Sequence, residues 1–299
     1  MPDQITVASV QEYKSNVELL MQQEGSRLRG MVGTDSYVGK QASVVEQFGE
    51  ATAQERTSRH ADTPLLGLSQ DKRWVFPKDI EWGSLIDQVD KLRMRISPEG
   101  MYTRAAAAGM NRKLDDIILA AFFATAFIGE NGTTSETFGT LGSGVYDVSV
   151  DLGGTASGIN VAKLQRALRL LMTANKGDLG EAVSSAISSY EHDLLLKEIQ
   201  IVNRDYNGGS AVLESGRVRR FMGFDFALTE RLTVTSGNRL IPAWVKSGMH
   251  LGVWQDLNAS IDKRADKGNA WQVYTSMTIG STRLQAGKVI RINCDDQIA

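Results

Sequence analysis

Residues 97–129, SPEGMYTRAAAAGMNRKLDDIILAAFFATAFIG, are the stretch that decides the fold. Ser97 suits a helix N-cap, Pro98 suits the first helical position, and Gly129 ends the run. Between them, apolar side chains recur every three or four residues, at Leu114, Ile117, Ile118, Ala121, Phe122, Thr125 and Ile128. This spacing predicts one long helix over 98–128, roughly 46 Å in length at about 1.5 Å per residue. The unbroken apolar run, 117–128, is too short to cross a membrane.

The composition is that of a globular protein without a strong charge bias. The chain has 299 residues, of which 42% are hydrophobic, and a formal net charge of −2. A chain of this size can bury a large core in one or two domains. The near-zero net charge excludes the broad basic surface of a dedicated duplex-DNA binder. Because there is one cysteine, Cys294, and the N-terminal residues lack a secretory pattern, we expect a protein of the reducing cytoplasm.

The first part of the chain has the pattern of an arm. Residues 8–22 place apolar side chains on one face of an amphipathic helix that has no partner nearby in the sequence. Residues 23–36 are rich in glycine and charge, so we expect them to form a flexible connection.

A long hairpin is predicted next. Residues 37–49 and 73–82 have strand patterns, and the polar stretch between them is too long for an ordinary loop of a compact domain. Trp74, Phe76 and Trp82 occupy alternate positions, which predicts one aromatic strand face. This face either contacts a neighbouring molecule or packs on the chain's own core, and the residues favour neither alternative.

The rest of the chain mixes helices and strands in the manner of an α+β protein. The expected helices lie at 84–96, at 181–203 and between Asn160, as N-cap, and Gly177. The expected strands lie at 144–151, 211–213 and 218–228, the last two joined by a turn at Gly216, and at 271–279 and 289–292, joined by a turn at Gly280. We expect the C-terminal strands to pack on the long helix.

No constellation of residues predicts catalysis. His60, His192 and His250 lack metal-ligand spacing and are expected at a surface or an interface. The glycine-rich loop at 130–144 lacks the pattern of a phosphate-binding loop. Asp115 and Asp116 are adjacent, so on a helix their side chains point about 100° apart, and we expect them to pair with nearby Arg112 or Lys113. The sequence therefore predicts no enzyme, metal site or cofactor.

Arg217, Arg219 and Arg220 form a basic cluster before MGFDF at 222–226. Such a cluster can meet phosphate, but it is more often a solvated or subunit-contacting face. The candidate subunit-contact residues are thus Trp74, Phe76, Trp82, Arg217, Arg219 and Arg220.

Several segments, in their order, carry a family resemblance. They are RKLDDIILAA at 112–121 with GENG at 129–132, EHDLL at 191–195, RDY at 204–206, GRVRRFMGFDF at 216–226, DKRADK at 262–267, AWQVY at 270–274, GSTRL at 280–284 and KVIRI at 288–292. In this combination the chain resembles the major capsid proteins of tailed bacteriophages, over roughly residues 35–296. A subunit of a bacterial encapsulin-like nanocompartment, which shares the fold, is the alternative.

The resemblance implies an α+β, Hong Kong 97-like capsid fold in four parts. They are an N-terminal arm at 1–36, an extended loop at 37–82, a peripheral domain with the spine helix at 83–143 and 265–299, and an axial domain at 144–264. It implies that copies assemble as hexamers and pentamers into an icosahedral shell around double-stranded DNA. The implied location is the virion, after assembly in the host bacterial cytoplasm. The implied partners are other copies, a separate scaffolding protein, a portal, a decoration protein and weakly held DNA, without a membrane or a cofactor.

Overall fold

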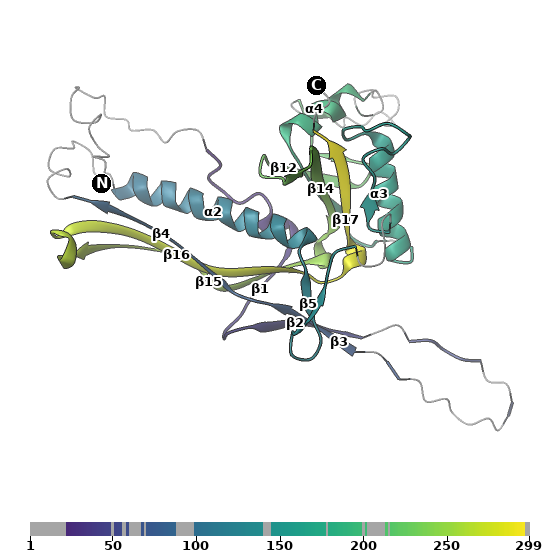
Figure 1. Cartoon of the computed structure of the whole chain (residues 1–299), viewed down its shortest axis with the longest axis horizontal. Coiled ribbons are helices and arrows are strands. Elements are labelled where there is room, and N and C mark those ends of the chain that lie inside the picture. Colours follow the sequence, from purple (N-terminus) through teal and green to yellow (C-terminus); the bar gives the residue numbers. More distant parts are fainter. Residues whose placement is uncertain are drawn as a thin grey trace.

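The structure is a computed structural model that describes residues 22–48, 51–55, 58–59, 67–68, 70–87, 99–139, 145–177, 179–198, 201, 213–214 and 216–296. The helix predicted at 8–22 lies outside these residues except for Gln22, and the tip of the predicted hairpin lies largely outside them. Figure 1 shows a long helix lying along a long, twisted sheet, with a second sheet and two shorter helices at one end.

The long helix, α2, spans Glu99–Phe123. Its start agrees with the prediction, but the predicted end at residue 128 is wrong, because β5 (Ala126–Ile128) is a strand. Two causes are visible. The guanidinium of Arg283 donates to the carbonyl oxygens of Phe122 and Ala124, at 2.8 and 3.0 Å, and so caps the last turn. The backbone of β5 then pairs on both sides, with β3 and β6.

A four-stranded sheet lies under α2 in the order β1-β15-β16-β4. Its strands are β1 (Gly33–Ser36), β15 (Met249–Arg264), β16 (Ala270–Arg283) and β4 (Lys78–Ile86). Along β16 the side chains of Val273, Thr275, Met277 and Ile279 are buried, and α2 packs on this strand. The predicted alternation at 271–279 and its packing on the long helix are therefore confirmed.

The turn predicted at Gly280 is wrong, because β16 continues through it to Arg283. A glycine is required at position 280 because another part of the backbone approaches it closely. A Cβ there would lie 2.2 Å from the carbonyl oxygen of Phe76, so only glycine lets the two backbones approach.

Residues 23–36 are not the flexible connection that the sequence predicts. The carboxylate of the fully buried Asp115 accepts hydrogen bonds from the side chains of Gln23 and Ser26 and from the backbone amides of Arg27 and Leu28, at 2.5–3.3 Å. After this clamp, β1 pairs in parallel with β15. The predicted pairing of the two aspartates with Arg112 or Lys113 is also wrong, since Asp116 pairs with Arg231.

The run predicted as one strand at 73–82 is two strands in different sheets. β3 (Gln70–Val75) ends before Pro77, which has no amide hydrogen to donate to a ladder, and β4 begins at Lys78. The helix predicted at 84–96 is wrong over 84–86, which belong to β4, and its part beyond Asp87 lies outside the described residues. The small sheet that contains β3 has the order β2-β3-β5-β6, with β2 at Ala42–Phe48 and β6 at Thr134–Glu136.

The second large sheet has seven strands. The order is β11-β12-β8-β14-β17-β7, with β13 pairing β14, and β9 and β10 form a separate two-stranded hairpin. The bounds are β7 (Asp147–Val148), β8 (Val183–Ile187), β9 (Leu213–Glu214), β10 (Arg217–Val218), β11 (Arg220–Phe221), β12 (Phe224–Leu228), β13 (Val234–Thr235), β14 (Asn238–Val245) and β17 (Val289–Asp295). Short 3-10 turns lie at Arg29–Met31, Lys246–Gly248, Ala265–Lys267 and Ala286–Lys288.

Two helices accompany this sheet. α3 (Val161–Ala174) is capped as predicted, since the side chain of Asn160 accepts from the amide of Lys163 at 2.9 Å. The helix predicted at 181–203 is wrong in its first part, because 183–187 form the fully buried β8. α4 (Ser189–Lys197) begins only after a capping box of Ser188 and Glu191.

After β14 the chain crosses between the two large sheets twice. β15 lies in the sheet under α2, although its residues belong to the expected axial segment 144–264. β17 lies in the seven-stranded sheet between β14 and β7, and it meets the end of the long helix through Arg291, whose guanidinium lies 5.7 Å from the ring of Phe123. Sheet membership therefore does not follow the boundary expected at residues 264 and 265.

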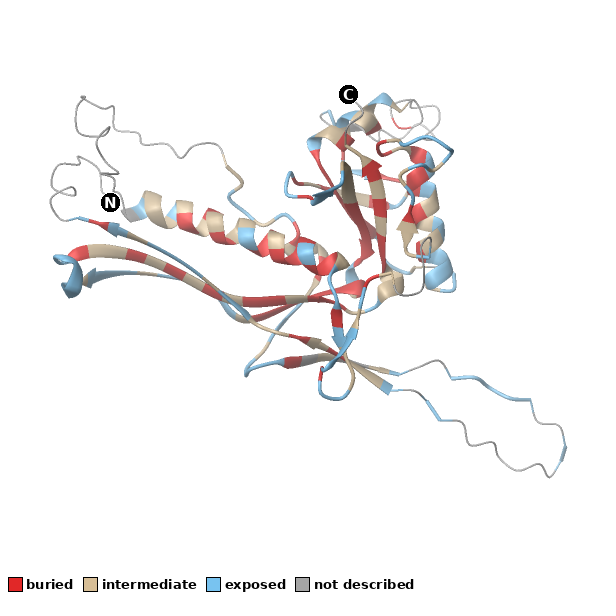
Figure 2. Ribbon diagram, viewed as in Figure 1, coloured by how far each residue is buried: buried red, intermediate tan, exposed pale blue. Residues whose placement is uncertain are grey.

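One core joins both parts of the molecule. The ring of Phe122, at the end of α2, lies 4.5 Å from the ring of Trp244 on β14, and the indole of Trp244 donates to the carbonyl oxygen of Met31 at 2.9 Å. Figure 2 shows buried residues running from α2 into the seven-stranded sheet. Because this core is continuous, damage at its centre affects both sheets.

Phe122→Asp is expected to destabilise the subunit by several kcal/mol, because it places a charge without a partner in this core. Arg112→Ala, which removes hydrogen bonds from Arg112 to Gln22 and Gln23, should be mild by comparison. Thermal melting and soluble yield measure both. An unchanged melting temperature for Phe122→Asp would show that the assigned orientation of α2 is wrong.

Asp115→Ala is expected to cost on the order of 3 kcal/mol, because it leaves the amides of Arg27 and Leu28 without their acceptor. Asp116→Ala is the matched control, since it removes the neighbouring carboxylate from a partly exposed ion pair that contributes about 0–1 kcal/mol. Chemical denaturation gives both values, and equal losses in the two variants would contradict the clamp.

Candidate subunit-contact surfaces

The described residues contain no group of three or more His, Cys, Asp or Glu side chains arranged to hold a metal. No helix in the described part of the chain is long and apolar enough to span a bilayer. His192 accepts a hydrogen bond from the amide of Val218 at 3.1 Å. The position expected for His250, at a surface or an interface, is wrong, because the residue is buried within the subunit beside Tyr37, whose hydroxyl lies 2.9 Å from its Nε2. Burial lowers the pKa of His250, and His60 lies outside the described residues.

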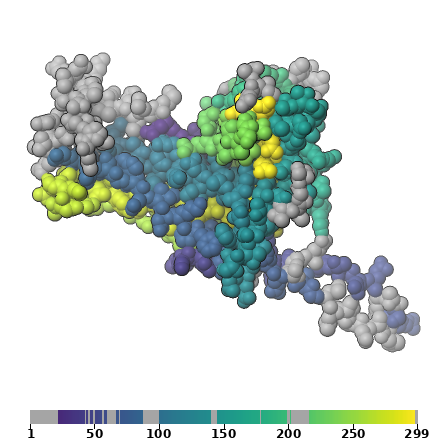
Figure 3. Space-filling model, in the orientation of Figure 1, coloured from purple at the N-terminus to yellow at the C-terminus, as the bar shows by residue number. Residues whose placement is uncertain are grey.

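The hairpin of β2 and β3 projects from the body of the molecule. Figures 1 and 3 show its described residues extending away from both large sheets. All described residues between Ala51 and Leu68 are exposed, and Phe48 at the end of β2 is 61% exposed. Val38, before β2, is 98% exposed. Exposed apolar side chains on a projecting element favour contact with another molecule.

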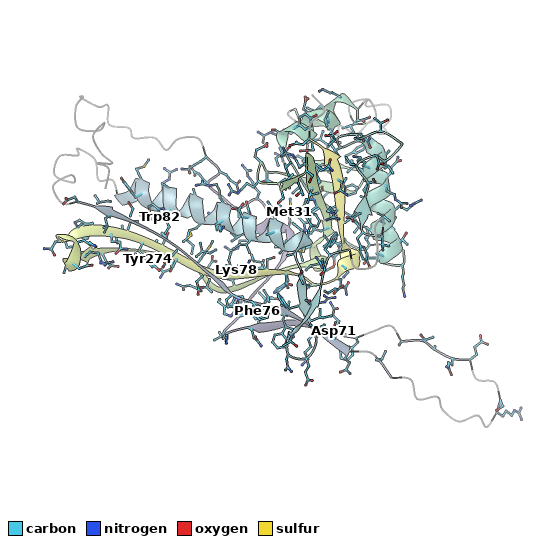
Figure 4. All side chains as sticks on the ribbon, viewed as in Figure 1. Met31, Asp71, Phe76, Lys78, Trp82 and Tyr274 are labelled. Carbon is cyan, nitrogen blue, oxygen red and sulfur yellow. The ribbon has the colours of Figure 1, made fainter. Side chains whose placement is uncertain are left out.

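The three predicted contact aromatics do not share one face. The indole of Trp74 on β3 donates to the carbonyl oxygen of Gly129 at 2.7 Å, and a Cβ at Gly132 would lie 2.8 Å from its Cγ. The ring of Phe76 packs at 5.1 Å from the ring of Phe127. Trp82 belongs to β4, further along the long sheet, and is 37% exposed (Figure 4). The prediction of a single aromatic strand face is therefore wrong, because Pro77 separates two strands.

A buried charge cluster fixes the root of the hairpin. Arg73 on β3 forms an ion pair with Glu136 on β6, and Arg283 at the end of β16 lies 5.0 Å from the ring of Phe138. Burial lowers the pKa of Arg283 to about 10, so it stays charged at neutral pH and complements the negative end of the α2 dipole. The cluster ties the hairpin sheet to the long helix and the long sheet.

The basic cluster runs from the β9–β10 hairpin, beside α4, into β11. As predicted, the turn is at Gly216, whose φ of +76° suits glycine, and it joins β9 to β10. Arg217, Arg219 and Arg220 are all exposed. Arg220 donates two hydrogen bonds to Asp225, at 2.5 and 2.9 Å, which raise the pKa of its guanidinium. The side chains of Arg217 and Arg219 have no hydrogen bond or ion pair with another residue that the structure describes, so both can meet a partner.

Two residues organise these surfaces in a way that sequence reasoning did not predict: Asp115 was assigned the wrong partners, and Arg283 was not singled out. Asp115 stands in the polar run NRKLDD at 111–116, and Arg283 follows GST at the end of β16, so neither residue is distinguished by its neighbours. What each side chain contacts lies more than 80 residues away in the chain, so no local pattern identifies the partners.

The comparisons agree with this architecture. The family model described as "Phage capsid protein" matches residues 5–296. A search of curated protein sequences gave no match. The family match favours a phage capsid over the nanocompartment alternative.

Solved capsid structures share the fold along the whole chain. The capsid of cyanophage P-SCSP1u has 13% identity and a TM-score of 0.73, covering 97% of this chain and 94% of that chain. The asymmetric unit of the cyanophage Pam1 capsid has 14% identity and a TM-score of 0.70, covering 100% of each chain. Mycobacterium phage Che8 gives 17% identity and a TM-score of 0.67, covering 95% and 96%. The predicted α+β capsid fold is confirmed, and the chain belongs to the phage capsid protein family.

Proposed function

We propose that this protein is the major capsid protein that assembles, as hexamers and pentamers, into the icosahedral head shell around packaged double-stranded DNA. The observation that carries the proposal is the projecting hairpin of β2 and β3, which has exposed apolar side chains and a rigid charged root. A hairpin of this kind contributes little to its own subunit and is suited to lie on a neighbouring copy. Family membership supports the same role.

On this proposal, each part of the fold has a role in the shell. The hairpin is the extended loop, the sheet under α2 is the main part of the peripheral domain, and the seven-stranded sheet is the main part of the axial domain. Residues before Gln22 serve as the arm, which the clamp at Asp115 anchors to α2. The exposed side chains of Trp82, Arg217 and Arg219 are the candidate contacts between subunits. Trp74 and Phe76 act indirectly, by shaping the root of the hairpin.

The remaining partners follow from the same role. We propose a separate scaffolding protein, a portal and a decoration protein as partners of the shell. The contacts of the subunit with the packaged DNA are weak and independent of the DNA sequence. The subunit acts by assembling, without catalysis, and its place is the virion after assembly in the bacterial cytoplasm.

The purified protein is expected to form capsomers or closed particles. Size-exclusion chromatography with light scattering, with and without the cognate scaffolding protein, measures the mass, and negative-stain microscopy shows the particles. A protein that stays monomeric at high concentration under both conditions would contradict the proposed function.

Replacing residues 51–68 by a short Gly-Ser turn is expected to leave the subunit folded but to abolish or weaken the shell. The described residues in this range are exposed, so their removal costs little burial within the subunit. In a shell the lost contact recurs at every interface, and the small losses add up.

The measurement is paired, with circular dichroism melting for the subunit and sedimentation for particles. Arg217→Ala with Arg219→Ala is a companion variant. It tests the exposed basic residues near α4 as a contact surface and leaves the hairpin of β2 and β3 unchanged. Normal shells from the hairpin variant would refute the extended-loop role, and a failure to fold would place the hairpin in the core.

A further inference from the structure

A cleft lies between α3 and the segment 147–153 that precedes it. Residues of β17 and β14 line its inner side, including Arg291 and Asn238. Its volume is about 920 Å³, near the upper end of the roughly 300–1,000 Å³ typical of ligand sites. None of the proposed subunit-contact residues lines it.

The lining of the cleft has an excess of positive charge. Three arginines, Arg166, Arg169 and Arg291, face a single carboxylate, Asp147. That carboxylate is already engaged, because Arg291 donates two hydrogen bonds to it, at 2.7 and 2.8 Å. Within the described part of the chain, the guanidinium groups of Arg166 and Arg169 have no hydrogen bond or ion pair. The cleft therefore holds two positive charges without a compensating group.

The positions of these two arginines favour an anion between them. Arg166 and Arg169 are three residues apart on α3, so their side chains are neighbours on one face and repel each other. A guanidinium is a planar fork of donors that matches the oxygens of a carboxylate or a phosphate. The amide side chains of Gln165 and Asn238, which also line the cleft, add uncharged donors.

The walls of the cleft are fixed in advance. Beside the two arginines, Lys163 is fully buried, and its Nζ donates to the carbonyl oxygens of Ser157 and Asn293, the latter at 2.8 Å. These bonds join α3 to β17 and to the segment that leads from the cleft into the helix. A ligand in the cleft would therefore meet a fixed backbone and, at Arg291, a donor side chain that is already held by Asp147, which lowers the cost of ordering on binding.

We propose that this cleft is a binding site for an oxyanion, with Arg166 and Arg169 as its principal ligands. The oxyanion is either a free phosphate or a carboxylate side chain of a second copy of this chain, since both present the same oxygen chemistry. A bound anion bridges α3 to the strands behind it and so stabilises this end of the molecule.

The first test measures phosphate binding to the dissociated, full-length subunit. Thermal melting is compared in sodium phosphate and in sodium chloride at equal ionic strength, and a ³¹P NMR titration follows binding directly. The cleft variant is Arg166→Gln with Arg169→Gln, and the matched control is Arg27→Gln with Arg104→Gln, which removes the same charges from exposed positions outside the cleft and outside the candidate subunit-contact surfaces.

Phosphate is expected to raise the melting temperature of the wild type and of the control by a few degrees more than it raises that of the cleft variant. In the NMR titration, the wild type and the control should show saturable phosphate binding, and the cleft variant should not. A general salt effect would raise all three equally. Equal shifts, or the absence of saturable binding in the wild type, would overturn the site. If the double cleft variant fails to fold, Arg169→Gln alone, at an exposed position, carries the same comparison.

The second test identifies the source of the oxyanion in assembled particles. Phosphate that binds particles as well as subunits shows a free anion as the ligand. Phosphate that binds subunits but is excluded from particles, together with a cleft variant that folds but assembles poorly, shows a carboxylate of a neighbouring copy. The subunit test stands whether or not particles form, so failure of the site and failure of the proposed shell function are distinguishable.

Discussion

The buried carboxylate of Asp115 is the interaction on which the arrangement of the chain depends. It accepts hydrogen bonds from four groups in residues 23–28, and so it holds the N-terminal segment against α2. The clamp brings the carbonyl oxygen of Met31 to the indole of Trp244, and it leads β1 onto the edge of β15. A carboxylate buried without such donors would cost several kcal/mol, so the segment and the helix require each other.

Arg283 has the corresponding role at the C-terminal end of the helix. Its guanidinium binds the last carbonyl oxygens of α2 and lies beside Phe138, so one side chain ends the helix and closes the root of the hairpin. The two charged residues mark the two ends of the segment of α2 that is buried most deeply. Between them, Phe122 connects the long helix to the seven-stranded sheet. The fold thus combines an apolar core with two buried charges that determine where segments meet.

Features that depend on neighbouring residues could be predicted from the sequence, and features that depend on distant residues could not. Asn160 and Gly216 act within a few residues, so the cap of α3 and the β9–β10 turn were predictable. The sequence of Val183–Ile187, with two serines, is compatible with a helix as well as with a strand. It forms a strand because β12 and β14 pair with it on both sides. The exposure of Arg217 and Arg219 follows from local charge, whereas the packing of Trp74 against Gly129 and Gly132 needs the fold.

The contact between Gly280 and Phe76 has a mechanical consequence for the whole subunit. At this point the sheet under α2, through Gly280, lies against the backbone of Phe76, which follows β3 of the small sheet. There is no room for a side chain between the two backbones. The direction in which the hairpin leaves the body is therefore restricted by a main-chain contact as well as by the side chains of Arg73 and Arg283 at its root. Substitutions at the exposed residues between Ala51 and Leu68 alter what the hairpin touches and leave this contact in place. The side chains that the hairpin presents can therefore change while this backbone contact at its root stays the same.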